Sequence, residues 1–400
     1  VNPGFEPGSA RMRQAALTTS SSFSTFFASD DEAPLTVDNM SRGHAAVKGW
    51  VETIRHAILH RGITLLDTAP WYGHGTSEIT IGYALSDLLV HEDGAVGESR
   101  IHRSSIVTNT KVGRYEADPK LQFDFTYDAT MNSVQRSLRR CCCRYFDVIQ
   151  IHDPEFATSL SELKDETIPA LVECRRKGWC KAIGITGYPL AVQHELLVSC
   201  NMNSDDTVFD QSLVYCHNNL HDMSLYDDQA FLWPNEMGRM SFAECCQKGN
   251  VKLMAAAPLS MGLLTCSGPP SWHPASQALR QACASAAQLC ESQEVDIASL
   301  ALLYALSQQE VGCVLLGMKD IQQVNVAADL ALRFDGIDLS KCRSSILDTV
   351  LTSTEKSVLE RLLDRTVGPF ANVWSSGEFR WDGVAEAKKH WALVESLKNG

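Results

Sequence analysis

The sequence GITLLDTAPWYGHG (residues 62–75) joins a short apolar run to a turn that carries reactive side chains. Asp67 ends the apolar run, and Tyr72 follows five residues later. Two later strand-like runs carry a reactive group in the same way, with Lys111 in SIVTNTKVGRY and His152 in FDVIQIHDPE. Active-site groups at the carboxyl ends of parallel strands are typical of a (β/α)8 TIM barrel. These three segments therefore predict an α/β barrel.

The rest of the chain alternates between strand-like and helical patterns. Short apolar runs bounded by turn residues indicate buried strands, and the longer amphipathic stretches between them indicate helices, among them residues 162–178 and 236–249. Residues 15–24 are expected to supply a strand at the front of the chain, although Thr and Ser make this N-terminal segment atypical. Eight strand–helix units predict a closed barrel. The other seven predicted strands are residues 62–67, 103–110, 146–151, 181–186, 207–213, 251–257 and 312–317.

We expect three regions along the chain. Residues 1–13 are predicted to be a disordered leader: they lack the apolar centre of a signal peptide, and the first methionine of the chain is Met12. Residues 14–335 are predicted to form the barrel, with the polar, turn-rich residues 33–46 as an inserted loop. Residues 336–400 are predicted to form a C-terminal helical extension that packs on the barrel.

The composition limits the class of partner. The chain has 400 residues and a net charge of −13, which opposes binding to nucleic acid. No apolar run approaches the length of about eighteen residues that a membrane span needs. We therefore predict a cytoplasmic monomer or weak dimer that acts on a small molecule and binds neither nucleic acid nor membrane.

The cysteines are expected to be reduced thiols. Fourteen occur, and Cys141, Cys142 and Cys143 are consecutive, which does not suit a framework of disulfides. No CxxC motif occurs, so we expect no zinc site. A metal-dependent hydrolase would need several His or Asp ligands after the strands, and only the pair His152–Asp153 offers any.

The four reactive groups suit chemistry at a carbonyl group. A tyrosine has an ordinary pKa near 10, so it needs help to exchange protons at neutral pH. We expect Lys111 to lower the pKa of Tyr72 and Asp67 to keep Lys111 charged. His152 is expected to hold or polarise a substrate oxygen. The set therefore predicts proton transfer by Tyr72 as hydride moves to or from the carbon.

These motifs resemble the aldo-keto reductases, a family of NAD(P)-dependent oxidoreductases on a (β/α)8 barrel. The segments DTAPWYG, TK and IHD match the catalytic tetrad of that family, and the resemblance covers residues 47–332. APLSMGLLT, GPPSWHPAS and KVGRYEAD are similar to the L-galactose dehydrogenase-like branch, which oxidises aldoses at the anomeric carbon. The resemblance implies an oxidoreductase for an aldose or another aldehyde or ketone.

The resemblance also implies where the cofactor binds. Thr186 and Gly187 stand where the family usually has Ser-Asn against the nicotinamide carboxamide, and Tyr215 stands where an aromatic ring stacks on the nicotinamide. The implied contacts to the pyrophosphate are Pro258, Leu259, Ser260 and Gly262, and those near the adenosine are Gly317, Met318, Lys319 and Gln323.

Two positions bear on the choice between NAD and NADP. Many NADP-preferring members have arginine where this chain has Gln323, although Lys319 offers a positive charge nearby. The missing arginine favours NAD slightly. On the substrate side we expect contacts from Trp71, Trp272 and His273, because an aromatic face suits the C–H surface of a sugar.

One departure from the family keeps a second hypothesis open. The first strand of the family carries glycines close to the cofactor, whereas QAALTTSSSFS has Thr and Ser there. The alternative is a barrel that binds nucleotide but turns over little, with a regulatory or interaction role.

Overall fold

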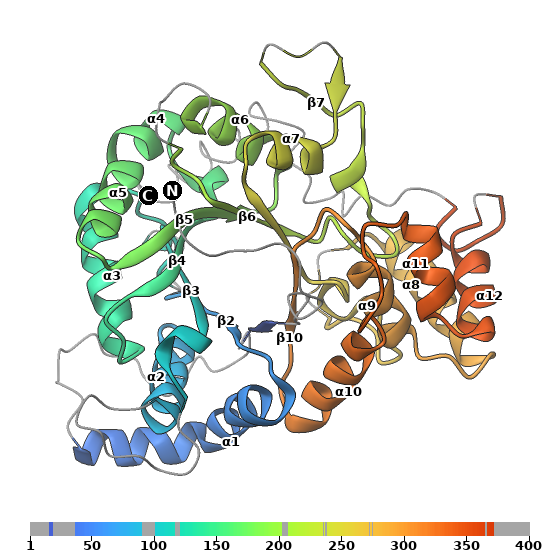
Figure 1. Ribbon diagram of the computed structural model, residues 1–400, viewed down its shortest axis with the longest axis horizontal. Helices are drawn as coiled ribbons and strands as arrows, with labels where there is room; N and C mark the ends of the chain where they lie inside the picture. The colour runs from blue at the N-terminus through green and yellow to red at the C-terminus, as the bar shows by residue number, and fades with distance from the viewer. Residues whose placement is uncertain are drawn as a thin grey trace.

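Eight parallel strands form a closed barrel in the computed structural model (Figure 1). The structure describes residues 16–18, 37–89, 101–116, 121–201, 207–234, 236, 238–271, 273, 275–364 and 366–371. The strands follow the order β1-β10-β9-β6-β5-β4-β3-β2 around the barrel. The predicted fold class is confirmed. The strands are β1 (Ala16–Thr18), β2 (Leu65–Asp67), β3 (Val107–Val112), β4 (Phe146–His152), β5 (Cys180–Gly187), β6 (Gln211–Tyr215), β9 (Lys252–Ala256) and β10 (Cys313–Gly317).

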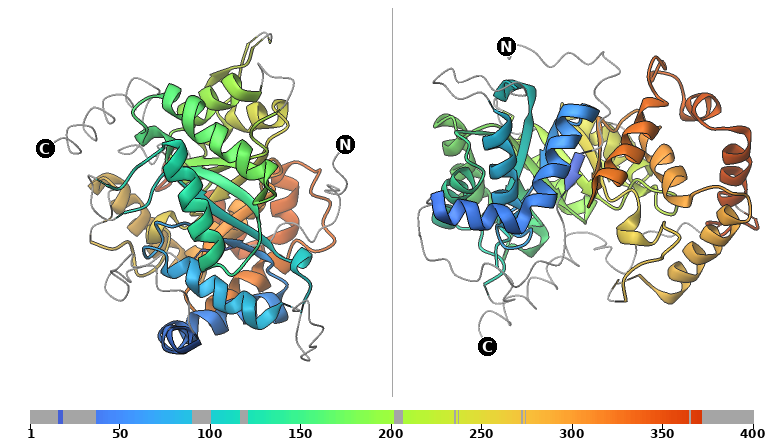
Figure 2. Two further views of the ribbon diagram at one scale, coloured as in Figure 1. Left: turned by 90° about the vertical axis from the view of Figure 1, so that its left-hand side faces the viewer. Right: turned by 90° about the horizontal axis from the view of Figure 1, so that it is seen from below.

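Helices surround the strands on the outside of the barrel. Figure 2 shows this ring of helices from one side and from below. The helices before β6 are α1 (Val37–Arg61), α2 (Thr76–Leu88), α3 (Tyr127–Arg140), α4 (Leu160–Glu162), α5 (Ile168–Arg176) and α6 (Leu190–Asn201). Those after β6 are α7 (Phe242–Lys248), α8 (Gln277–Glu291), α9 (Ile297–Leu306), α10 (Ile321–Leu332), α11 (Arg343–Val350) and α12 (Ser353–Leu362).

The central strands are buried on both faces, which explains their apolar sequences. In β4 only Asp147 is half-buried, and every other residue of the strand is buried. A parallel strand covered by helices outside and by side chains inside reads as a nearly continuous apolar run. Inside the barrel, four buried residues from β6, β9 and β10 pack against Leu65 of β2; they are Leu213, Met254, Cys313 and Leu315.

A glycine allows two of the outer helices to approach closely. Gly82 lies in α2, and a Cβ atom at this position would collide with the carbonyl oxygen of Arg140 at the end of α3. The same region is held by Arg140, whose Nη1 donates to the Glu78 carboxylate at 3.4 Å. The α2–α3 contact therefore depends on the absence of a side chain at residue 82.

Two segments differ from the predicted helices. Residues 236–249 were expected to be one helix, but β8 (Arg239–Met240) pairs with β7 (Phe231–Leu232) in a small antiparallel hairpin. Helix α7 begins only at Phe242, because Ser241 and Glu244 form a capping box there. Within 162–178, a π-helical turn at residues 163–167 separates α4 from α5.

The prediction that residues 33–46 form a loop is wrong for most of this range. Helix α1 begins at Val37, so residues 37–46 are helical. Extending a helix that is already nucleated costs little, so a polar composition alone does not end it. The rest of the predicted loop, residues 33–36, and the predicted leader 1–13 lie outside the described residues.

The described part of the C-terminal region packs onto the barrel. Ile346 of α11 and Leu362 of α12 belong to the same hydrophobic core as the barrel helices. Helices α11 and α12 lie beside α8 at one end of the molecule (Figures 1 and 2). The boundary between residues 335 and 336 stays a prediction. Among the described residues, none of the helices is both long and apolar enough to cross a membrane.

All fourteen cysteines lie within the described residues, and none is in a disulfide. Nine are buried, so they fill the core as small apolar side chains. Burial raises the pKa of several of their thiols, for example that of Cys313 to about 12.

Candidate active site

The four predicted catalytic residues meet at the carboxyl ends of three neighbouring strands. Asp67 ends β2, Lys111 lies near the end of β3, and His152 ends β4. These strands pair in parallel, so their ends lie at the same edge of the barrel. Tyr72 follows in the turn between β2 and α2, where its amide donates to the Ala69 carbonyl oxygen at 3.0 Å.

Lys111 forms a buried ion pair with Asp67. The distance between Lys111 Nζ and Asp67 Oδ2 is 2.6 Å, and the two side chains are 1% and 0% exposed. Lys111 Nζ also donates to the Thr68 carbonyl oxygen at 2.9 Å, and Gln150 Nε2 donates to Asp67 Oδ1 at 3.3 Å. Burial alone would lower the pKa of Lys111, but Asp67 and Tyr72 outweigh it and raise that pKa above its ordinary value. Lys111 is therefore a fixed positive charge.

This positive charge lies against Tyr72. The distance from Lys111 Nζ to the centroid of the Tyr72 ring is 4.6 Å. Burial raises the pKa of Tyr72 above 10.0, and the opposing effect of Lys111 does not outweigh it. The expected net lowering of this pKa was therefore wrong, because the cost of burying a phenolate exceeds the attraction of one ammonium group. Tyr72 is a neutral phenol in this structure, with its proton available for donation.

His152 lies edge-on to Tyr72 and is also neutral. The two ring centroids are 5.9 Å apart, and the ring planes are perpendicular. Burial lowers the pKa of His152 to about 3, with further lowering by Lys111 and Arg114 and an opposing effect of Asp153. A neutral imidazole has one N–H donor and one acceptor. Nδ1 of His152 is buried without a hydrogen-bond partner among the described residues.

Three residues that were not predicted to be catalytic complete this edge, namely Arg114, Asp153 and Gln150. Arg114 Nη1 donates to Asp153 Oδ2 at 2.6 Å, and the Arg114 guanidinium lies 4.2 Å from the centroid of the Trp71 ring. Trp71 is thereby held in place beside Tyr72. Gln150, the third residue, holds Asp67. Gln150 could have been found from the sequence, because it is a polar residue inside the apolar run FDVIQIHD. Arg114 could not, because its contacts depend on the packing of segments that are separate in the sequence.

The residues predicted to contact nicotinamide lie at the next two strand ends. Thr186 and Gly187 end β5, and Tyr215 ends β6. The Gly187 carbonyl oxygen accepts from Gln193 Nε2 at 3.0 Å, and Ser212 Oγ donates to Gln193 Oε1 at 2.7 Å. These bonds fix the backbone at the end of β5.

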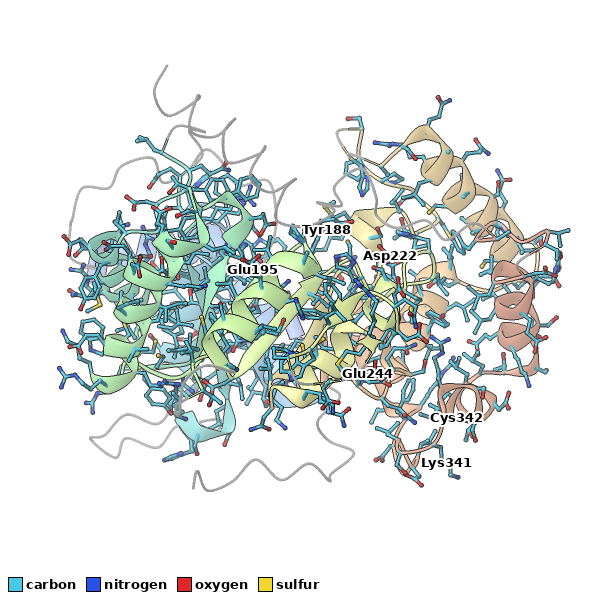
Figure 3. All side chains as sticks on the ribbon, turned by 90° about the horizontal axis from the view of Figure 1, so that it is seen from above. Tyr188, Glu195, Asp222, Glu244, Lys341 and Cys342 are labelled. Carbon is cyan, nitrogen blue, oxygen red and sulfur yellow. The ribbon has the colours of Figure 1, made fainter. Side chains whose placement is uncertain are left out.

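Tyr188 directly follows β5 and lies near residues at and after the end of β6. Its ring centroid lies 6.5 Å from that of Tyr215 and 4.8 Å from that of His217. The His217 ring bonds to the Tyr188 carbonyl oxygen at 2.6 Å and lies 3.8 Å from Asp222. Tyr188 and Asp222 accordingly lie close together in Figure 3.

The predicted pyrophosphate contacts lie in an unusual turn after β9. Ser260, Met261 and Gly262 all have positive φ, at 47°, 50° and 95°. Ser260 Oγ bonds to His221 Nε2 at 2.9 Å, which secures the turn. Within the turn the Ser260 amide donates to the Ala257 carbonyl oxygen at 2.9 Å and the Gly262 amide donates to the Leu259 carbonyl oxygen at 3.1 Å, so contacts from this turn to a pyrophosphate stay a prediction. The predicted residues of this turn are Pro258, Leu259, Ser260 and Gly262.

The predicted adenosine contacts follow β10. Gly317 ends the strand, Met318 is buried, and Lys319 is exposed. The Lys319 amide donates to Gln323 Oε1 at 2.9 Å, so the Gln323 side chain is used within the turn that leads into α10.

The three residues predicted to contact the substrate lie in different surroundings or outside the described residues. Trp71 lies beside Tyr72, as described above. Trp272 lies outside the described residues. His273 is buried, with Nε2 at 3.2 Å from the Ser260 carbonyl oxygen and Nδ1 accepting from the Ala275 amide at 3.0 Å. Both ring nitrogens of His273 therefore bond to the loop after β9, and its contact with the substrate stays a prediction.

Comparison with known proteins identifies the family. The model of the aldo/keto reductase family matches residues 49–346. The chain belongs to the aldo/keto reductase family. The family predicted from the motifs is confirmed, and the chain is an NAD(P)-dependent oxidoreductase. Among the described residues, no group of three or more His, Cys, Asp or Glu side chains is placed to hold a metal ion.

Sugar dehydrogenases are among its relatives. The L-galactose dehydrogenase of Arabidopsis thaliana is 36% identical over 298 residues, which cover 74% of this chain and 82% of that protein. The D-arabinose 1-dehydrogenase of Saccharomyces cerevisiae is 32% identical over 280 residues, or 70% of this chain and 75% of that protein.

Solved structures agree in fold. The holo form of an aldo-keto reductase from Bacillus halodurans superposes with a TM-score of 0.53 at 22% identity, over 89% of this chain and 93% of that chain. A glycerol dehydrogenase of Gluconobacter oxydans gives a TM-score of 0.54 at 22% identity, over 80% of this chain and 86% of that chain.

The geometry at this edge fits a nicotinamide dinucleotide. Tyr215 offers an aromatic ring at the end of β6, and Thr186 offers a hydroxyl group near the end of β5. A buried carboxyl oxygen of Glu155 has no hydrogen-bond partner among the described residues. It lies beside Gly187, which ends β5.

Proposed function

We propose that the protein oxidises an aldose, with Tyr72 as general acid and base. The observation that carries the proposal is the buried unit in which Asp67 holds Lys111 against Tyr72. The substrate class is supported by two relatives whose names are those of aldose dehydrogenases, L-galactose dehydrogenase and D-arabinose 1-dehydrogenase.

Tyr72 exchanges a proton with the substrate oxygen. When bound, the nicotinamide ring accepts hydride from the substrate carbon in oxidation and returns it in reduction. In reduction Tyr72 gives its proton to the carbonyl oxygen and becomes a phenolate, which Lys111 stabilises. In oxidation the phenolate takes the hydroxyl proton. Because burial raises the pKa of Tyr72, we expect oxidation to speed up as pH rises and deprotonates it.

His152 orients the reacting oxygen as a neutral hydrogen-bonding group. Its pKa of about 3 keeps the imidazole uncharged at physiological pH. An uncharged ring beside Tyr72 can bond to a substrate oxygen without competing with Lys111 for the negative charge of the phenolate.

The remaining predicted residues form the proposed cofactor site. Gln323 carries no charge and is bonded to the Lys319 amide, which supports the slight preference for NAD over NADP. The other proposed contacts are Thr186, Gly187, Tyr215, Pro258, Leu259, Ser260, Gly262, Gly317, Met318 and Lys319.

The test compares two Tyr→Phe variants. Purified protein is mixed with NAD⁺ or NADP⁺ and a panel of aldoses, and the absorbance of the reduced nicotinamide is followed. We expect Tyr72→Phe to lower kcat by roughly 10²- to 10⁴-fold while the Kd for NAD⁺ stays unchanged. Tyr145→Phe is the matched control, because Tyr145 precedes β4 at the opposite end of the barrel.

Turnover of Tyr72→Phe at the parent rate would contradict the mechanism. Binding of NAD⁺ by the parent protein, without turnover of any aldose, aldehyde or ketone, would favour the regulatory role instead.

A further inference from the structure

Glu155 is a buried acid next to the candidate active site. It lies in the turn Pro154–Phe156 after β4, three residues beyond His152, and is 2% exposed. Its Oε1 accepts from the Tyr188 amide at 3.2 Å. Its Oε2 is buried and has no hydrogen-bond partner among the described residues. A buried oxygen without a partner is costly, so its retention calls for an explanation.

Gly187 makes room for this carboxyl group. A Cβ atom at residue 187 would lie 2.6 Å from Glu155 Oε2 and 3.1 Å from Pro154 Cδ. The backbone of Gly187 is held by Gln193, so it cannot easily move away. The Glu155 carboxyl therefore occupies the space that a side chain at the end of β5 would take.

The location of this oxygen points toward the cofactor side of the site. Gly187 pairs with Val214 of β6, and Tyr215 follows directly. Glu155 Oε2 thus lies beside the end of β5, and β5 pairs with the strand that carries His152 and with the strand that carries Tyr215. Ligands of parallel barrels bind at this edge.

The charge state of Glu155 limits what it can bind. Burial raises the pKa of the Glu155 carboxyl well above its ordinary value, and the nearby Asp153 raises it further. These effects favour the neutral acid, which has one O–H donor and one carbonyl acceptor. A primary amide offers the complementary pair, an N–H donor and a carbonyl acceptor. A neutral carboxyl group can accordingly replace the amide side chain of Asn or Gln.

We propose that the Glu155 carboxyl binds the carboxamide of the nicotinamide ring, using the space that Gly187 leaves open. This inference rests on the proposed placement of the nicotinamide between Gly187 and Tyr215. Glu155 then sets which way the nicotinamide ring faces the substrate and favours cofactors that carry the carboxamide.

Binding experiments with two ligands test the proposal without turnover. NAD⁺ carries the carboxamide, whereas ADP-ribose has the same adenosine and pyrophosphate but no nicotinamide. The Kd of each is measured by titration calorimetry for the parent, Glu155→Leu and Glu155→Gln proteins. Glu155→Leu loses both hydrogen-bonding atoms, and Glu155→Gln keeps an amide of the same shape. Thermal unfolding shows that each variant is folded.

We expect Glu155→Leu to bind NAD⁺ roughly ten- to a hundredfold more weakly, with the Kd for ADP-ribose unchanged. Glu155→Gln should bind NAD⁺ within about threefold of the parent, because Gln can donate and accept as the neutral acid does. Gly187→Ala provides an independent variant: its Cβ displaces the carboxyl group, so it should weaken NAD⁺ and leave ADP-ribose unaffected.

Three results would overturn the inference. The first is an unchanged Kd of Glu155→Leu for NAD⁺, and the second is an equal loss for NAD⁺ and ADP-ribose, which indicates a structural role. The third is a raised KM for the aldose with NAD⁺ binding intact, which assigns Glu155 to the sugar. In all three the parent still binds NAD⁺ and the proposed function stands. Failure of the parent to bind either nucleotide would overturn both.

Discussion

The buried ion pair between Lys111 and Asp67 gives the sharpest prediction for stability. The substitution Lys111→Met removes the ammonium group but keeps an unbranched side chain of similar length. It leaves the Asp67 carboxylate, which is 0% exposed, without its ammonium partner and with only uncharged side chains beside it, such as Gln150 at 3.3 Å. Removing one partner of a buried ion pair typically costs about 3–5 kcal/mol.

A second estimate, made from the pKa of Asp67, gives a similar loss of stability. In the variant the stranded Asp67 can become neutral by taking up a proton. Its ordinary pKa is 3.8. Protonating it at pH 7 therefore costs about 4 kcal/mol, at about 1.4 kcal/mol per pH unit. This cost is an upper limit on the loss from the stranded charge, and it falls to about 2 kcal/mol at pH 5. Burial already raises the pKa of Asp67 in the parent, and Lys111 opposes that effect, so the loss of Lys111 raises this pKa further and the variant loses more stability than the parent as pH rises.

The assay is urea unfolding of four proteins at pH 7 and pH 5: the parent, Lys111→Met, Asp67→Asn and the double variant. We expect Lys111→Met to lose about 4 kcal/mol at pH 7 and about half of that at pH 5. The double variant should recover to within about 2 kcal/mol of the parent, because no buried charge is left unpaired. A loss below about 1 kcal/mol, no recovery in the double variant, or no dependence on pH would refute the reasoning.

Two further substitutions test the electrostatics of His152 and the packing of α2. The pKa of His152 is about 3 in the folded protein against an ordinary 6.5, so the parent should lose up to about 5 kcal/mol through this residue as pH falls from 6.5 to 3. His152→Gln should flatten this pH dependence of the urea midpoint, and parallel curves for the two proteins would contradict the pKa. Gly82→Ala should destabilise the protein by about 1–3 kcal/mol, because the added Cβ meets the Arg140 carbonyl oxygen. Gly49→Ala in α1 is the matched control, since nothing lies within 4 Å of its Cβ, and it should be neutral or stabilising by up to about 1 kcal/mol.

Much of the barrel was predictable because its strands carry a strong local signal. Segments such as FDVIQIH are buried on both faces, and their apolar runs stand out between amphipathic helices. The hairpin β7–β8 was missed because its strands are only two residues long and are defined by pairing between separate segments. The start of α1 was missed because a polar sequence continues a helix that packing has already nucleated.

Some residues of the candidate site could likewise be predicted from the sequence, and others could not. Asp67, Tyr72, Lys111 and His152 could be selected from the sequence, because each follows or ends a recognisable strand and parallel strands place their ends at one edge. Glu155 could not, because its significance depends on the empty space at Gly187, which lies on another strand.

The sequence by itself indicated the order of the barrel strands, the family and the candidate reactive groups, because these depend on local patterns of side chains. Only the tertiary structure decided their protonation states. Burial raises the pKa values of Tyr72 and Glu155 and lowers that of His152. These shifts depend on how much water the folded chain removes from each group, and residues distant in the sequence set that quantity.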